Sequence, residues 1–457
     1  MARATLVDSA EHTLDLQYYI YDPDKIGQFI TERILEAANR GVRVRLLLDD
    51  NNQADDRHLI VLAAHPNIQV RVFNPFHFRG RWMKTTEYLT DLNRVNRRMH
   101  NKVLVADNQL AILGGRNIGD NYFGISEEDN FRDFDLLMAG PLVKETSAAF
   151  DMFWNSPWAI PAEALTRTPI TPSESEELNR SLQTIVFGAE GSRERYAGLR
   201  DEYMREVTEN PDHLAWAKGE VIWDSPNKMK GNSAETTRVA RRLELEFDEC
   251  KEELLVECGY FVPGAAGVKQ LADLAKKGVR IRMITGALEA TDQPLVYSAY
   301  RRYRKELLAS GIELYEFKVQ AKPMSPRPRR WFAPKGPPAS LHSKAMVFDR
   351  QRIWIGSFNL DERSKRYNTE IAAVIESPEL AAQLSRNILE DATPERSWLV
   401  KLVRNPGGGA STTHARVFWA GERNGVAQEL PLEPARSWWQ RFRVKLYSLI
   451  PFVEKLL

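Results

Sequence analysis

Two stretches of the chain carry the same polar residues at the same intervals. The first reads HNKVLVADNQLAILGGRN (100–117) and the second HSKAMVFDRQRIWIGSFN (342–359). In each stretch a histidine is followed by a lysine, an aspartate, a glycine-containing turn and an asparagine. Such repetition indicates that the chain consists of two halves built on one plan.

The segments ahead of these two cassettes also match. A strand, a helix and a second strand are predicted at 14–21, 27–41 and 42–50 in the first half, and at 253–261, 267–278 and 279–287 in the second. Short strands follow at 65–75 and 310–319. Strands that alternate with helices favour a parallel sheet covered by helices. We therefore predict two α/β domains with pseudo-twofold symmetry, and mixed, mostly parallel sheets flanked by helices.

Composition suggests where the domains end. TPITPSESEELNRS (168–181) is polar and contains two prolines, which is typical of a linker. We predict a first domain at 1–165, a linker with connecting helices at 166–210, a second domain at 211–395, and a C-terminal tail with an amphipathic helix at 396–457.

Charge and cysteine content exclude several classes of protein. The net charge is only +1, so no global field favours nucleic acid. The two cysteines, Cys250 and Cys258, are too few for a disulfide framework or a cysteine-rich zinc site, and we expect both to be reduced, with at least one buried. No apolar run of about 18 residues predicts a membrane-spanning helix. The sequence leaves open whether a longer natural chain precedes its first helix-then-strand pattern.

The cassette suits an anionic substrate. Alternation along a strand places His100 and Lys102 on one face, and likewise His342 and Lys344. The lysine is a point charge for a phosphate oxygen, and it favours the neutral, nucleophilic form of the histidine. A lysine in each cluster argues against a metal cage, so we expect neither a metal nor a cofactor.

Four further residues are expected to bind the same anion. Asn117 and Asn359 follow turns that contain Gly115 and Ser357, and such turns bring backbone and amide donors together.

Two aspartates complete the catalytic set. Asp107 and Asp349 lie five residues beyond each lysine, on the opposite parity from the histidines. We expect them to organise the turn or to buttress the site.

Asp133 in FRDFDLLMAGP (131–141) and Glu370 in YNTEIAAVIESP (367–378) match one another, and a carboxylate there would orient an imidazole and hold its Nδ1 proton.

A twofold arrangement explains the duplication. One histidine attacks phosphorus and forms a phosphohistidine, while the other protonates the leaving alkoxide and then deprotonates the incoming hydroxyl. Two lysines and two asparagines neutralise the phosphoryl oxygens in the transition state.

These residues resemble the phospholipase D superfamily, whose mark is His-x-Lys-x4-Asp-x6-Gly-Ser-x-Asn twice per chain. The first copy departs from this pattern at Gly115, where serine is common. Within the superfamily the chain is most similar to the bacterial cardiolipin synthases of the C type, through LDLQYYIY, RGVRVRLLLDDNN, RRMHNK, GGRNIGDNYF and LIPFVEKLL.

The resemblance implies two phospholipase D-type domains that form one site at their interface. His100 would be the nucleophile and His342 the general acid and base, paired with Glu370 and Asp133 respectively. The implied reaction transfers a phosphatidyl group from one phospholipid, phosphatidylethanolamine in the C type, to the hydroxyl of phosphatidylglycerol. It also implies a peripheral enzyme on the cytoplasmic face of the bacterial inner membrane, with phospholipids and the membrane surface as partners and no nucleic acid.

Three segments are candidates for contact with lipid. SWWQRFRVKLYSLI (437–450) predicts a basic amphipathic helix, whose apolar stripe either lies on an anionic membrane or docks on the protein core. The stretch 76–100 either lines a lipid entrance or forms ordinary surface. The proline-rich stretch 326–338 is either a gate or a solvated basic turn.

Other functions stay open on the residues alone. Phospholipid hydrolysis, with water as the acceptor, uses every one of the same catalytic residues. A nuclease of the same superfamily is disfavoured by the near-neutral charge, and a non-enzymatic membrane-binding module by two intact cassettes. The sequence does not indicate an oligomeric state.

Overall fold

The computed structural model of the 457-residue chain describes residues 1–52, 56–79, 86–87, 89–126, 130–165, 171–188, 191–209, 214–231, 237–318, 339–403 and 415–449. The chain divides into two compact units. The first contains Met1–Phe123, Asp135–Arg238 and Tyr367–Ala372, and the second contains Gly124–Phe134, Val239–Arg366 and Ala373–Leu457. Each unit therefore includes a short segment from the opposite half of the sequence.

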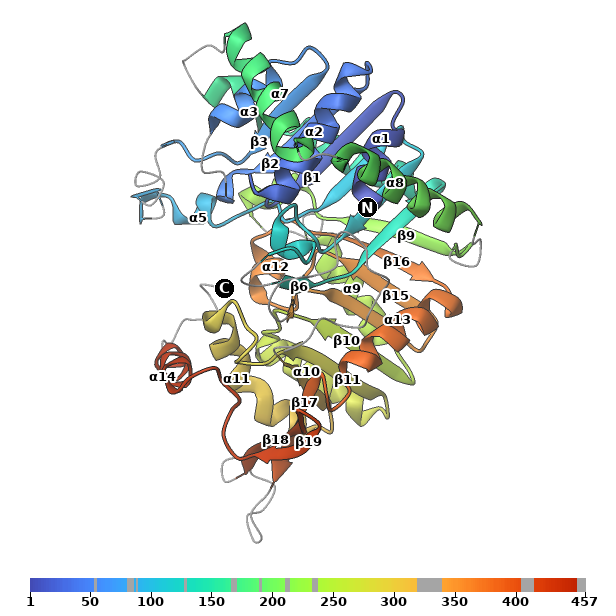
Figure 1. Cartoon of the computed structure of the whole chain (residues 1–457). Coiled ribbons are helices and arrows are strands. Elements are labelled where there is room, and N and C mark those ends of the chain that lie inside the picture. The colour runs from blue at the N-terminus through green and yellow to red at the C-terminus, as the bar shows by residue number, and fades with distance from the viewer. Residues whose placement is uncertain are drawn as a thin grey trace. The chain divides into compact units, whose positions relative to one another are not determined.

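A seven-stranded sheet forms the core of the first unit (Figure 1). Its strand order is β7-β5-β4-β1-β2-β3-β8. The bounds are β1 (Thr13–Tyr18), β2 (Arg43–Asp49), β3 (Ile68–Phe73), β4 (Val103–Ala106), β5 (Leu110–Gly114), β7 (Asp135–Ala139) and β8 (Ala159–Pro161).

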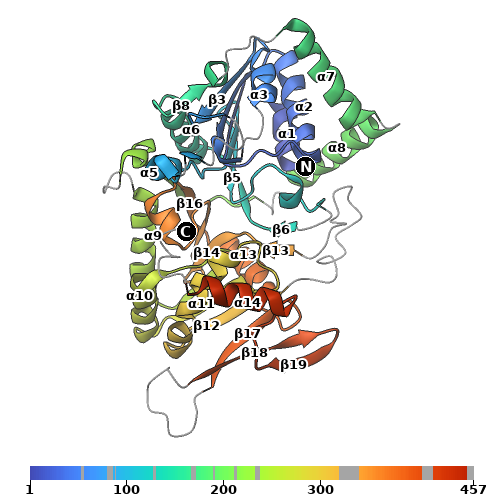
Figure 2. The ribbon, with the colours of Figure 1, turned by 90° about the vertical axis from the view of Figure 1, so that its left-hand side faces the viewer.

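Helices cover both faces of this sheet. Figure 2 shows α6 (Pro141–Trp154) on one face and α2 (Lys25–Asn39) on the other. α7 (Pro172–Phe187) packs over α2, and α8 (Ser192–Glu209) packs over α1 (Ala2–Ser9). The first unit also contains α3 (Asp56–Ala63) and the short α5 (Leu92–Val95).

The second unit is built on strands of a ten-stranded sheet, and its strands run in the order β19-β18-β17-β12-β11-β10-β14-β15-β16. The strands are β10 (Glu253–Cys258), β11 (Arg280–Gly286), β12 (Glu313–Phe317), β14 (Lys344–Phe348), β15 (Arg352–Gly356), β16 (Ile371–Glu376), β17 (Ser397–Val403), β18 (Arg416–Arg423) and β19 (Val426–Leu430). The helices are α9 (Arg238–Glu249), α10 (Gly264–Lys276), α11 (Pro294–Ala309), α12 (Glu362–Arg366), α13 (Pro378–Asp391) and α14 (Trp438–Tyr447). β6 (Asn130–Arg132) and β13 (Ala339–Leu341) form a separate parallel pair.

The two sheets repeat one topology. The order β5-β4-β1-β2-β3 in the first recurs as β15-β14-β10-β11-β12 in the second. The expected mixed α/β architecture is confirmed, but the expectation of mostly parallel sheets is wrong. In each of these sheets parallel pairing joins the three strands connected by helices, whereas the cassettes fold as antiparallel hairpins, β4-β5 and β14-β15.

A two-residue turn makes each cassette a hairpin. Asp107 and Asn108 have φ of 52° and 54°, and Asp349 and Arg350 have φ of 52° and 55°. Two consecutive residues with positive φ form the turn that suits the twist of a hairpin, and aspartate and asparagine tolerate that conformation.

The units also differ from the expected domain boundaries. The predicted second domain begins at residue 211, whereas the first unit continues to Arg238. There β9 (Lys218–Trp223) contacts α6, and the N–H of Val221 donates to the Glu145 carboxylate at 2.7 Å. The expected tail at 396–457 supplies β17, β18 and β19 to the second sheet, so much of it is part of the domain.

The cassette of the first unit begins in the hydrophobic core. Met99, immediately before His100, is fully buried among Leu47, Phe73, Phe150 and Phe153. This packing fixes the backbone from which His100 projects. None of the helices in the described part of the chain has the length and apolarity needed to cross a bilayer. Both cysteines are free and buried, as expected.

The cassette aspartates bind backbone. Asp107 accepts hydrogen bonds from the N–H groups of Glu11, His12 and Thr13 at 2.7–2.8 Å, immediately ahead of β1. Asp349 accepts equivalent bonds from residues 251–253 ahead of β10. In both cases burial acts to raise the pKa of the carboxyl, but the backbone donors outweigh it and leave the pKa below the ordinary value.

Changing Asp349 to asparagine should lower the free energy of unfolding at neutral pH by about 2 kcal/mol, because a neutral amide accepts these bonds less strongly. The lowered pKa means that the contribution of the carboxylate is fully present above the unfolded-state pKa. It is lost as the pH falls through the folded-state pKa. Urea unfolding from neutral pH down to a pH of about 3 should show the variant and the wild type converging in acid. A difference that stays constant with pH would contradict a charge-based role.

Candidate active site

His100 is paired with a carboxylate from the second half of the chain. Its Nδ1 lies 2.9 and 3.1 Å from the two carboxylate oxygens of Glu370, within the first unit. The imidazole is 6% exposed and Glu370 is fully buried. A parallel bridge between Met99 and Thr369 aligns the two residues, because His100 and Glu370 each follow one partner of that bridge.

The backbone of Glu370 is held in place by a residue of a buried ion pair. The N–H of Asp224 donates to the Glu370 carbonyl at 3.0 Å, and the N–H of Glu370 donates to the Asp224 carboxylate at 3.2 Å. Lys228 donates to the same carboxylate at 2.7 Å, and the Asp224 and Lys228 side chains are fully buried. The carboxylate facing His100 is thus on backbone held from both sides.

His342 is placed in the same way in the second unit. Its Nδ1 lies 2.7 Å from the Asp133 carboxylate, and both residues are 4% exposed. Here the β13–β6 pair aligns Leu341 with Arg132, one residue ahead of His342 and Asp133. The His342 N–H donates to the Arg132 carbonyl at 2.9 Å. These are the two His–carboxylate pairs that the resemblance implies, and in each the backbone register sets the partner.

The carboxylates determine the chemical form of the rings. An ionised carboxylate accepts only, so a neutral imidazole facing it carries its proton on Nδ1, and the lone pair is then on Nε2. Aromatic contacts fix the ring planes. Tyr19 meets His100 edge-on at 5.0 Å between centroids, and Tyr260 meets His342 edge-on at 5.5 Å.

The cassette lysines are buried beside the histidines. Lys102 and Lys344 are each 1% exposed, and each Nζ donates to the carbonyl of its own histidine. The Lys344 Nζ also lies 3.2 Å from Nδ1 and 3.5 Å from Nε2 of His342. The expected placement of both residues within one strand is only partly right. β4 begins at Val103 and β14 at Lys344, so the histidines lie just ahead of the strands.

The predicted anion-binding residues are buried after each hairpin. Asn117 accepts from the N–H of Ile20 at 3.1 Å and donates to the Tyr122 hydroxyl at 2.8 Å. Asn359 is 6% exposed, and its Oδ1 has no hydrogen-bond partner among the described residues. Gly115 is also buried, and Ser357 is 0% exposed. Asp107 and Asp349 lie in the hairpin turns, where they bind backbone rather than the histidines.

Sequence reasoning missed several supporting residues. Tyr19 and Tyr260 follow β1 and β10, and their occurrence in QYYIY and CGYF was a usable signal. A Cβ on Gly259 would lie 2.1 Å from the Leu341 carbonyl oxygen, so only glycine lets the chain before Tyr260 pass this close to His342. The Asp224–Lys228 pair had no such signal, because nothing in DSPNK indicates contact with Glu370.

Asp49, at the end of β2, holds the residue before His100. Its carboxylate accepts from the N–H of Met99 at 2.8 Å and lies 3.5 Å from the Arg98 guanidinium. Burial raises the pKa of this carboxyl, and attraction to Arg98 together with the backbone bonds limits the rise to about 6.

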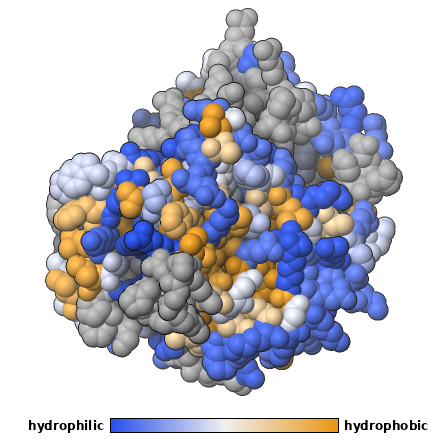
Figure 3. Space-filling view, turned by 90° about the horizontal axis from the view of Figure 1, so that it is seen from below, coloured by the Kyte–Doolittle hydropathy of each residue, from blue (hydrophilic) through white to orange (hydrophobic). Residues whose placement is uncertain are grey.

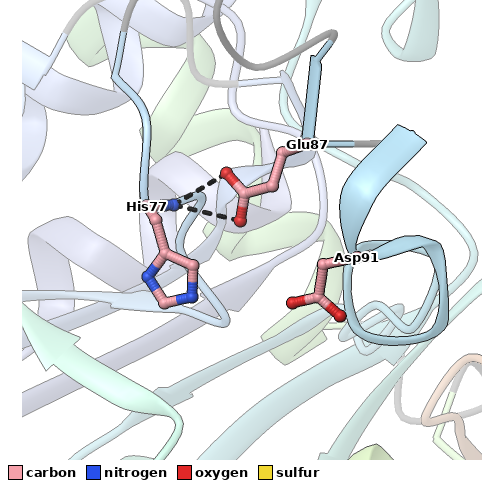
Figure 4. A group of neighbouring side chains, drawn as sticks. All are labelled: His77, Glu87 and Asp91. Carbon is pink, nitrogen blue, oxygen red and sulfur yellow. Dashed lines mark hydrogen bonds between the residues drawn. The ribbon is translucent and has the colours of Figure 1, made fainter.

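Among the described residues, one group of side chains has the residue types and the closeness that could bind a metal ion. His77, Glu87 and Asp91 approach one another (Figure 4). However, Arg94 pairs with Glu87 and, at 2.7 Å, with Asp91, while Glu87 also accepts from the N–H of His77 at 2.9 Å. Because a guanidinium already neutralises both carboxylates, the group is an ion-pair cluster that shapes the loop.

Other cations of the stretch 76–100 are also held by the protein. Arg79 pairs with Asp50, Arg97 donates to the Lys228 carbonyl at 2.8 Å, and Arg98 is fully buried. Residues Arg81 and Lys84 lie outside the described residues, as does all of 326–338. The described cations of 76–100 therefore serve structure in large part, which weakens the view of this stretch as a basic lipid entrance.

Comparison with known proteins agrees with this geometry. The family model "Cardiolipin synthase, PLD-like domain" matches residues 4–154 and 243–392, one match for each cassette. The chain is 37% identical over 459 residues to cardiolipin synthase C of Escherichia coli K12, covering 100% of this chain and 93% of that protein. A cardiolipin synthase of Geobacillus kaustophilus is 28% identical, covering 84% of this chain and 62% of that protein.

A solved structure supports the fold. The phosphatidylserine synthase of Haemophilus influenzae Rd KW20 superposes with a TM-score of 0.56 at 14% identity, covering 86% of this chain and 83% of that one. The repeated topology, the two His–Lys cassettes and the full-length identity converge, and the chain belongs to the cardiolipin synthases with phospholipase D-like domains.

Proposed function

We propose that the chain makes cardiolipin by transferring a phosphatidyl group to the hydroxyl of phosphatidylglycerol, through a covalent phosphohistidine. Phosphatidylethanolamine is the proposed donor. The observation that carries this proposal is the pair of buried imidazoles, each with Nδ1 against a carboxylate and a buried lysine beside it. Membership of the cardiolipin synthase family supports the choice of substrates.

In the first half-reaction Nε2 of His100 attacks the phosphorus of the donor. The bond from phosphorus to the ethanolamine oxygen breaks, and the imidazolium of His342 gives its Nε2 proton to the departing alkoxide. The product alcohol leaves, and the phosphatidyl group stays on His100. Glu370 keeps the Nδ1 proton in place and stabilises the positive charge that the ring acquires.

The second half-reaction runs the same steps in reverse with a different alcohol. Neutral His342 removes the proton from the phosphatidylglycerol hydroxyl, whose oxygen attacks phosphorus. The bond from phosphorus to Nε2 of His100 breaks, and His100 is regenerated. Asp133 stabilises the imidazolium of His342 in both steps. The mechanism requires both histidines to reach one phosphorus atom.

The other cassette residues are proposed to act on the phosphoryl oxygens. Lys102 and Lys344 supply positive charge, and Asn117 and Asn359 supply amide donors, with Gly115 and Ser357 shaping the turns. Asp107 and Asp349 are proposed to hold the hairpins in place. No metal or cofactor takes part in the proposed steps. Because both substrates are membrane lipids, the enzyme is proposed to act peripherally at the inner membrane, on its cytoplasmic face.

The products distinguish transfer from hydrolysis. Vesicles of phosphatidylglycerol alone, of phosphatidylethanolamine alone, and of both should be incubated with the protein and analysed by mass spectrometry. Cardiolipin and free ethanolamine should form when both lipids are present. Phosphatidic acid as the only product would make the protein a hydrolase, and cardiolipin formed equally well from phosphatidylglycerol alone would remove phosphatidylethanolamine as the donor.

Replacing each of the two histidines should affect catalysis in a different way. His100→Ala and His342→Ala should each reduce cardiolipin formation by at least about a thousandfold without unfolding the protein. A phosphatidyl ester of 4-nitrophenol needs no proton on its leaving group, so His342→Ala should still release nitrophenolate and accumulate phosphoenzyme. Phosphate trapped on any residue other than His100 would overturn the assignment of the nucleophile.

The same assay should distinguish the roles of the two carboxylates. Glu370→Gln and Asp133→Asn keep side-chain size and burial but remove the charge that stabilises each imidazolium, so each should slow turnover by about a hundredfold or more. The nitrophenyl substrate should restore the rate of phosphoenzyme formation in Asp133→Asn and not in Glu370→Gln. Equal restoration in both variants would contradict distinct roles, and thermal unfolding provides the control for folding.

A further inference from the structure

α14 is docked on the second unit through one side only. It lies along α11 (Figure 2), and Val444 is fully buried. Gln440 donates to the Leu288 carbonyl at 2.6 Å, and Arg302 donates to the carbonyl of Ser448 at 2.9 Å, just beyond the helix. These contacts fix the orientation of the helix on its unit.

The opposite side of α14 is apolar and exposed. Trp438, Trp439, Phe442 and Leu446, together with Leu449 in the turn just beyond the helix, are 63%, 55%, 49%, 52% and 73% exposed, and we call these five residues the outer face. Successive residues of a helix are about 100° apart, so the outer face spans about 100° and its centre lies roughly opposite Gln440 and Val444. Figure 3 shows apolar atoms on the surface at the left edge, where α14 lies.

The rings of the outer face form one cluster. Trp438 and Trp439 stack with their centroids 4.4 Å apart, and Phe442 lies 5.5 Å from Trp439 with its ring edge-on. A contiguous aromatic cluster held in water exposes apolar surface that a folded protein ordinarily buries. Tryptophan is favoured at the boundary between water and lipid, since its ring is apolar and its N–H can still reach a polar group.

The charged residues of α14 have one sign. α14 contains Arg441, Arg443 and Lys445 and no acidic residue. On the helix, Arg443 and Lys445 flank the outer face on its two sides, and both are exposed. Cations at the rim of an apolar face match the anionic headgroups of a lipid surface. A second copy of the chain would instead bring like charges together across a self-complementary contact.

We propose that the outer face of α14 is a docking surface for an anionic phospholipid bilayer. The five apolar side chains enter the interface between headgroups and acyl chains, and Arg443 and Lys445 contact lipid phosphates. This inference rests on the proposed function in one respect, namely that the substrates are membrane lipids. Both alternatives for the C-terminal helix enter this proposal, because α14 docks on the protein through one side and presents its aromatic stripe on the other.

The test measures binding of the full chain to vesicles, not turnover. Flotation with vesicles of phosphatidylethanolamine and phosphatidylglycerol should recover the protein, and vesicles of phosphatidylcholine alone should recover about tenfold less. The double variant Trp438→Gln, Leu446→Gln should weaken binding to the anionic vesicles by about tenfold. Arg443→Glu with Lys445→Glu should lower it by a similar factor and remove the preference for anionic lipid.

Matched controls come from the first unit. Leu214 and Trp216 are 54% and 102% exposed, so Leu214→Gln with Trp216→Gln removes the same side chains elsewhere and should leave binding unchanged. His100→Ala should also bind vesicles as the wild type does, which separates docking from catalysis. Equal losses in the two Trp–Leu variants would overturn the proposal. So would a dimer in solution that the α14 variant dissociates while vesicle binding persists, since a second copy would then cover the outer face.

Discussion

The structure depends on a hydrogen bond between a buried imidazole and a buried carboxylate, made once in each unit. Both partners are costly to bury alone, because an isolated charge or an unpaired polar group loses its hydration. In each unit one short parallel backbone contact sets the pair, Met99 with Thr369 and Leu341 with Arg132. The catalytic chemistry proposed here follows from that register, since a shift of one residue would turn the carboxylate away from the ring.

This constraint explains why each unit contains a short segment from the other half of the sequence. The segment Tyr367–Ala372 belongs to the first unit and Gly124–Phe134 to the second, so each histidine receives its carboxylate from the opposite half of the chain. The Asp224–Lys228 ion pair then holds Glu370 by its backbone. Neither half of the sequence contains a complete histidine–carboxylate pair. Each half of the sequence therefore supplies the carboxylate that faces the histidine of the other half.

Local sequence patterns predicted much of the fold and of the site. Periodicity located β1, β2, β10 and β11, and the duplicated spacing identified both histidines and lysines. The hairpins were missed because the positive φ of Asp107 and Asp349 interrupts runs whose composition favours continuous strands. The contacts of Asp224 were missed for another reason. They depend on pairings between segments far apart in sequence, and such tertiary pairings leave no periodic trace in a single chain. The apolar stripe of α14 was predicted, but the sequence left open whether the stripe docks on the protein or stays exposed.

The proposed mechanism has both imidazoles act on one phosphorus atom. Vanadate tests this directly, because it adopts the trigonal-bipyramidal geometry of phosphoryl transfer. A crystal structure of the protein with vanadate should show vanadium bonded to Nε2 of His100. An apical oxygen on the opposite side should accept a hydrogen bond from Nε2 of His342. Vanadate bound to one histidine, with the other ring turned away and out of hydrogen-bond reach, would contradict the account.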